Sequence, residues 1–80
     1  MLLLNGVETS IANGQHQLTW DIGTGSGLLE FSVDGLPFQE VPDSSKSASD
    51  GKIVTLCDCR IKATLTGDAQ MSISPVRLLK

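Results

Sequence analysis

The residues best suited to chemistry are the pair Cys57-x-Cys59 and the single histidine, His16. A thiol and an imidazole can form a nucleophilic pair. Two thiols and one imidazole supply three soft metal ligands, although structural zinc normally takes four. On one extended strand the two thiols point the same way but stay apart, which disfavours a disulfide between them. We therefore expect two reduced cysteines, no catalytic pair and no metal site.

Other groups of residues that resemble sites are better explained by structural roles. Residues 23–27 are rich in glycine, as in a phosphate-binding loop, but a strand-like segment follows instead of a Lys-Ser/Thr and a helix. The acidic residues are scattered, and several lie in turns. Trp20 is either core bulk, the commoner role, or a platform on which a sugar stacks. The sequence thus predicts that the protein is not an enzyme and holds no cofactor.

Composition excludes several classes of protein. The chain has 80 residues, 40% hydrophobic and 19% charged, with a formal net charge of −3. This indicates one small domain over residues 1–80. The six basic residues form no stripe of the kind that nucleic-acid binding requires. No apolar run reaches the length of a membrane span or of a secretory signal. We expect a protein made in a cytoplasm, with no nucleic-acid or membrane partner.

Period-two alternation of apolar and polar residues is the dominant pattern and predicts strands. The longest alternating run, residues 53–66, places Ile53, Thr55 and Cys57 on the same face as Ile61. It exceeds a typical strand, so we expect a break near Cys57-Asp58. Other predicted strands cover residues 16–20, 29–33 and 70–74, with shorter ones at 7–11 and 38–41.

Glycine turns separate the predicted strands, and helix signals are nearly absent. Asx-Gly pairs are strong turn signals, and the chain contains Asn5-Gly6, Asn13-Gly14, Asp34-Gly35 and Asp50-Gly51. The Ser-rich segment 42–51 is predicted to be an exposed loop. The pattern predicts an all-β fold: a small antiparallel β-sandwich or partly open barrel of about six to eight short strands.

Both ends of the chain are apolar. Segments 1–5 and 76–80 contain the candidate interface residues Leu2, Leu3, Leu4, Val76, Leu78 and Leu79. They could be outer strands that cover their own sheet, or interface arms that pack on a neighbouring subunit. A domain this small has little stability to spare, and burial against another chain would add to it. We therefore expect a homo-oligomer.

Residues 27–75 resemble the small β-sandwich virion proteins of tailed bacteriophages. In those proteins a strand ends in Ser-x-Asp-Gly before an aromatic residue and a short Val strand, as at Ser32-Val33-Asp34-Gly35, Phe38 and Val41 here. A glycine then opens a strand, and an Arg-Ala-like strand ends at a glycine, as in residues 51–56 and 60–67. The chain departs from the family at Phe38, where Trp is common. Cys57-Asp58-Cys59 replaces the usual Pro-containing turn.

The resemblance implies a non-enzymatic structural protein of a bacteriophage virion. The first expectation is a capsid cement or decoration protein, whose partners are the major capsid protein or other virion proteins. The alternative is an accessory module of a phage head or tail that binds a carbohydrate or a host surface. That alternative requires Trp20 on an exposed concave face. A third possibility, a small enzyme, would require His16 to lie beside Cys57 or Cys59 in a cleft. The resemblance itself points to no functional residue.

Overall fold

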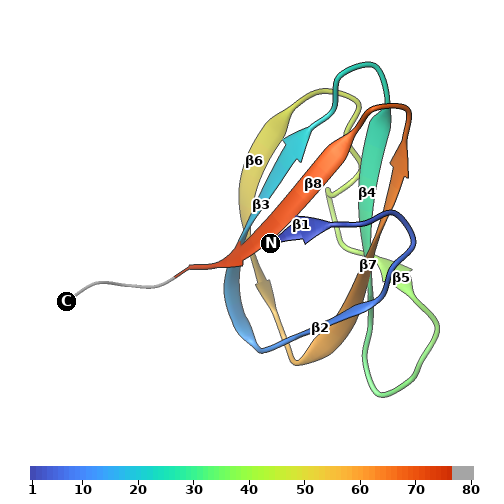
Figure 1. Cartoon of the computed structure of the whole chain (residues 1–80). Helices are drawn as coiled ribbons and strands as arrows, with labels where there is room; N and C mark the ends of the chain where they lie inside the picture. The colour runs from blue at the N-terminus through green and yellow to red at the C-terminus, as the bar shows by residue number, and fades with distance from the viewer. Residues whose placement is uncertain (77–80) are drawn as a thin grey trace.

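The computed structural model describes residues 1–76 as two four-stranded antiparallel sheets packed face to face (Figure 1). The first sheet has the order β1 (Leu2–Leu3), β8 (Gln70–Pro75), β3 (Gly14–Asp21) and β6 (Asp50–Leu56). The second has the order β2 (Thr9–Ile11), β7 (Cys59–Thr66), β4 (Ser26–Ser32) and β5 (Gln39–Glu40). The chain is therefore a small β-sandwich, as predicted.

The core lies between the sheets and follows the predicted alternation in the central strands. In β3 the side chains of Leu18 and Trp20 are buried, and in β8 those of Met71 and Ile73 are buried. The other buried apolar residues are Leu3, Ile22, Leu29, Val41, Ile61, Ala63 and Ala69. Apolar burial of this kind is the main stabilising contribution in so small a domain.

The break at Cys57-Asp58 is confirmed, but the predicted face of the strand before it is wrong. Val54 and Leu56 pack against the core, whereas the side chain of Ile53 is 52% exposed. β6 belongs to the first sheet and β7 to the second, so the two-residue turn carries the chain across the sandwich. The inner faces of the two sheets point toward each other, and the alternation therefore changes phase at the turn.

The glycine turns are partly as predicted. Asp34 and Gly35 both have positive φ, 55° and 75°, as an Asx-Gly turn requires. Asp50-Gly51 is not a turn: both residues lie in β6, where Asp50 pairs with Trp20. A Cβ at Gly25 would lie 1.7 Å from the backbone oxygen of Thr66, so only glycine allows this close approach of β4 to β7.

The two sheets are linked differently at their two sides. On one side the N-terminal chain crosses from β1 to β2, and Gly6 N–H donates to Ala63 C=O at 2.8 Å. The Asn5 side chain accepts a hydrogen bond from Leu65 N–H at 2.9 Å. The opposite side carries the edge strands β6 and β5 and the segment that joins them. The two sides offer separate surfaces to other molecules.

Candidate assembly surfaces

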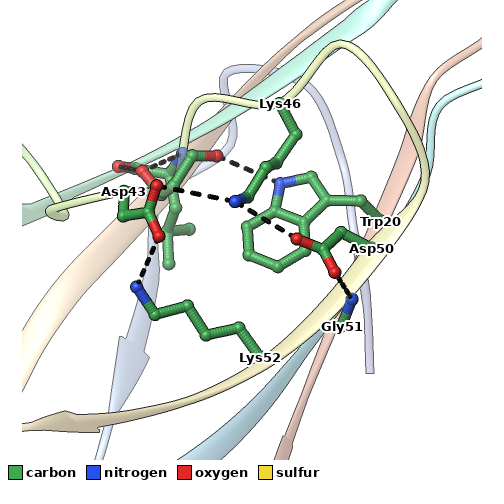
Figure 2. A network of polar contacts seen from close by, with 8 residues as sticks. Trp20, Asp43, Lys46, Asp50, Gly51 and Lys52 are labelled. Atoms are coloured by element: carbon green, nitrogen blue, oxygen red, sulfur yellow. Dashed lines mark hydrogen bonds and ion pairs between the residues drawn. The ribbon is translucent and has the colours of Figure 1, made fainter.

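The segment between β5 and β6, residues 42–49, is fastened to the core and is called the strap here. Ser44 is only 1% exposed. Its Oγ accepts a hydrogen bond from Leu29 N–H at 3.2 Å and donates one to Leu29 C=O at 2.9 Å. Its C=O accepts a bond from Trp20 Nε1–H at 3.1 Å (Figure 2). The predicted exposed loop 42–51 is correct for most side chains but wrong for Ser44, and Asp50 belongs to β6.

Charged side chains link the strap to β6. Lys46 Nζ lies 3.2 Å from Asp50 Oδ2, 3.6 Å from Asp43 Oδ1 and 5.6 Å from the centroid of the Trp20 ring. Lys52 Nζ lies 3.1 Å from Asp43 Oδ2. Figure 2 shows these groups arranged around the indole. These contacts tie the strap to Asp50 and Lys52 of β6 and to the ring of the core tryptophan.

The same contacts shift the ionisation of these groups. The hydrogen bond from Lys52, followed by the charge of Lys46, lowers the pKa of Asp43. The N–H of Gly51 and then the side chain of Lys46 lower the pKa of Asp50. The hydrogen bond to Asp50 raises the pKa of Lys46. Because these carboxylates are solvent exposed, the pairs fix geometry more than they add stability.

A groove of about 350 Å³ lies beside β6 on this side of the sandwich. One wall is β6 itself, and Phe31, Val41, Pro42 and Cys57 form the rest. Val54 and Leu56, from the inner face of β6, border the groove. The groove is mainly apolar, and it runs along a strand that has a neighbour on one side only. Such a surface suits contact with another polypeptide.

Four exposed apolar residues of the N-terminal segment, together called the N-terminal patch here, offer a second candidate surface. It comprises Met1, Leu2, Leu4 and Val7, whose side chains are 57%, 56%, 62% and 49% exposed. Met1 N donates to Ile73 C=O, and Ile73 N–H donates to Met1 C=O, both at 2.9 Å. These bonds hold the start of the chain against β8. The patch is thus presented by a hydrogen-bonded part of the sandwich.

The predicted interface residues have different surroundings. Leu2 and Leu4 are exposed in the N-terminal patch. Leu3 is 5% exposed and packs in the core of its own sandwich, so it is not available to a partner. Alternation along β1 explains this difference. Val76 is half-buried, and its N–H donates to Gln15 C=O. Leu78 and Leu79 lie outside the described residues.

The three candidate reactive residues, His16, Cys57 and Cys59, line three different hollows. Buried His16 bonds through Nε2 to the Ala12 C=O at 2.9 Å and lines a hollow with Met1 and Pro75. Cys59 lines another hollow, of about 820 Å³, on the side where Arg60 lies 3.6 Å from Glu8. Burial raises the pKa of the Cys59 thiol, which opposes formation of the nucleophilic thiolate.

Trp20 is a core residue. Its side chain is 1% exposed, and its Nε1–H is already donated to the strap. It cannot stack on a sugar in this fold, so the exposed aromatic platform that the carbohydrate-binding alternative requires of Trp20 does not exist. Neither composition nor spacing in the sequence could distinguish this role from that of a platform.

Residues 1–76, the part of the chain that the structure describes, hold neither a metal-ligand cluster nor a membrane-spanning helix. No three or more His, Cys, Asp or Glu side chains in that range are placed to hold a metal ion. The same range has no helix long and apolar enough to cross a membrane. Comparison with protein-family models, with curated proteins and with solved structures gave no match. The groove beside β6 and the N-terminal patch are the two apolar surfaces of the sandwich described above.

Proposed function

We propose that the chain is a non-enzymatic structural protein of a bacteriophage virion, a capsid cement or decoration protein that stabilises the shell through contacts between subunits. Its partners are the major capsid protein or other virion proteins, together with further copies of itself. It is made in the host cytoplasm and acts in the virion. The resemblance of residues 27–75 to such proteins supports this proposal.

The observation that carries the proposal is the N-terminal patch. Its four apolar side chains come from the first seven residues, and each is about half exposed or more. Exposed apolar side chains that come from one short segment are candidates for a protein-binding surface. Burying them against a shell subunit would gain roughly 25 cal/mol for each Å² of apolar surface removed from water. A shell offers many equivalent sites, so weak contacts of this kind act together.

The carbohydrate-binding alternative lacks a comparable observation. It depended on an exposed Trp20, and that residue is buried and hydrogen-bonded to the strap. The structural role instead has the exposed apolar side chains of the N-terminal patch to support it.

The proposal is tested on phage particles purified by density gradient from a culture that produces the chain. Mass spectrometry should find the chain in the particles, and particles stripped of it should regain it when it is added back. The double variant Leu2→Ser, Leu4→Ser should bind the stripped particles at least about tenfold more weakly, because it removes two of the four exposed apolar side chains of the patch. Leu36→Ser, which changes a residue 59% exposed outside the patch, is the matched control.

Two outcomes would contradict the proposal. One is the absence of the chain from purified particles. The other is binding by the double variant that equals binding by Leu36→Ser, because the patch would then contribute nothing. Circular dichroism of each variant shows whether the sandwich is still folded, which both outcomes require.

A further inference from the structure

The edges of the two sheets differ greatly in length within residues 1–76. The edge strands β1, β2 and β5 have two, three and two residues. The fourth edge strand, β6, has seven residues and pairs only with β3. Short edges offer few unpaired backbone groups, whereas a long edge is a template for another strand. β6 is therefore the edge at which strand addition is most favourable.

The direction of the backbone groups in β6 follows from the hydrogen bonds of β3. Val76 N–H donates to Gln15 C=O at 2.9 Å, so Gln15 faces the β8 side. Backbone groups of successive residues in a strand face alternate neighbours, and His16 therefore faces β6, where it lies opposite Val54. Ile53, the next residue in β6, must then direct its N–H and C=O away from β3.

The same alternation turns the backbones of Gly51 and Thr55 outward. Gly51 N–H donates to Oδ1 of the neighbouring Asp50 at 2.8 Å, as expected of a group with no partner in β3. No other described strand lies beside Ile53 and Thr55 on this side. Apart from the Gly51 N–H, these outward backbone donors and acceptors of β6 have no partner in another described strand.

The side chains of β6 leave this edge open. Gly51, Ile53 and Thr55 are exposed and uncharged, and Ile53 is one of the large apolar residues on the surface. Natural edge strands are usually blocked by proline, by a bulge or by an outward lysine. The one lysine of β6, Lys52, instead points to the strap and is held by Asp43 at 3.1 Å.

We propose that β6 pairs with β6 of a second copy of this chain, antiparallel and about a two-fold axis at Ile53. Ile53 then exchanges both backbone hydrogen bonds with Ile53 of the second copy, and the two exposed side chains cover each other. Thr55 N–H donates to Gly51 C=O of the second copy, so the bond between Gly51 and Asp50 is kept. The first sheets of the two copies become one continuous sheet.

The register follows from the residues of β6. A two-fold axis at Lys52 would place two lysines directly opposite each other, which is unfavourable. An axis at Val54 would leave Asp50 and Gly51 without partners in the facing strand. Shifting the pairing by one residue would turn the inner face of one copy outward in the other. With the axis at Ile53, every residue of β6 has a partner in the facing strand. The inner faces of β6 in the two copies then lie on the same side of the joined sheet, over the grooves beside β6.

The charge of the strand favours a second copy as its partner. Asp50 and Lys52 are the charged residues of β6, and their charges cancel. Two copies of the strand therefore bring no net charge together. The outward backbone groups are also placed symmetrically about Ile53, as an interface with a two-fold axis requires.

This inference deepens the proposed function, on which it rests for the expectation that the chain self-associates. It assigns self-association to β6, at the opposite edge of the first sheet from β1 and the N-terminal patch. Both surfaces can then be occupied at the same time. A solution experiment on the purified chain tests the dimer without reference to phage particles.

The test measures the mass of the chain by analytical ultracentrifugation over a concentration series. Ile53→Lys and Ile53→Glu each place like charges at the two-fold axis and should weaken self-association by about tenfold or more. An equal mixture of the two variants should restore it, because the lysine of one copy then faces the glutamate of the other. Thr19→Lys, at an exposed position of the central strand β3, is the control and should self-associate as the unchanged chain does.

Loss of the dimer in each Ile53 variant and its return in the mixture would establish the pairing. A monomeric unchanged chain, variants that dimerise normally, or a mixture that stays monomeric would each overturn it. Failure of the proposed function looks different: the chain would be absent from particles while the ultracentrifugation pattern is as expected. Failure of the inference alone would leave the chain in particles and the pattern wrong.

Discussion

Replacing Ser44 by Ala tests whether the strap is fastened to the core by its hydroxyl. Ser44 Oγ accepts the hydrogen bond of Leu29 N–H at 3.2 Å, in a buried setting. The Leu29 C=O accepts a hydrogen bond from the Ser44 hydroxyl at 2.9 Å and another from Val41 N–H at 2.9 Å. The substitution therefore leaves the Leu29 N–H without its acceptor, while the carbonyl keeps one donor.

The expected cost follows from this single buried donor. Leaving a buried N–H unsatisfied costs about 1–3 kcal/mol, so we expect a loss of about 2 kcal/mol in the free energy of unfolding. The bond from Trp20 Nε1–H is kept, because its acceptor is the main-chain carbonyl of Ser44. For a domain of this length, 2 kcal/mol corresponds to a fall in Tm of about 8–16 °C.

The assay is thermal and urea unfolding, followed by circular dichroism and by the fluorescence of Trp20. Chain concentration is held constant, because dimerisation would make Tm depend on it. Ser47→Ala, at an exposed position of the same strap, is the control and should change stability by less than about 0.5 kcal/mol. If Ser44→Ala is as stable as this control, the hydroxyl does not fasten the strap and the argument is refuted.

Three further predictions concern single positions. Gly25→Ala should unfold the chain or cost at least about 3 kcal/mol, measured by urea unfolding, because its Cβ would collide with backbone. Lys46→Met should remove the part of the stability that the unchanged chain loses at high pH, as pH rises through the pKa of Lys46, which is raised above 10.5. The loss of stability at low pH, where Asp50 titrates below 3.8, should persist in this variant, because the N–H of Gly51 also lowers the pKa of Asp50. Ellman's reagent at pH about 8 should react faster in Cys59→Ser, which keeps exposed Cys57, than in Cys57→Ser, because burial raises the pKa of Cys59.

The strands with strict alternation could be predicted from the sequence. In β3 and β8 apolar residues alternate with polar ones, and Leu18, Trp20, Met71 and Ile73 are all buried. The two strands lie beside each other in the first sheet, and only the inner face of that sheet is covered by the second sheet. Their apolar residues are therefore buried on that one face. Local pattern and tertiary packing agree there, which is why the sandwich was predictable.

The face of β6 and the role of the strap could not be predicted from local pattern. Residues 53–66 alternate as if they formed one face, and only the crossing between sheets shifts the phase, exposing Ile53. Ser44 sits in a Ser-rich polar run, and its burial depends on Leu29 and Trp20, which are 15 and 24 residues away in the chain. The groove beside β6 and the N-terminal patch could not be predicted from local pattern either, because they consist of residues that the fold leaves uncovered.

The positions of the two surfaces lead to a last prediction. In the first sheet β6 and β1 are the opposite edges, so a dimer formed through β6 carries its two N-terminal patches at its far ends. Two linked patches bind a surface of repeated sites more tightly than one, by a factor of about 10²–10⁴ where the spacing matches. The variant Ile53→Lys keeps its patch but not its dimer, and should therefore bind stripped particles more weakly than the unchanged chain, in the same binding assay. Equal binding by the two would mean that each copy attaches on its own and that pairing through β6 contributes nothing to attachment.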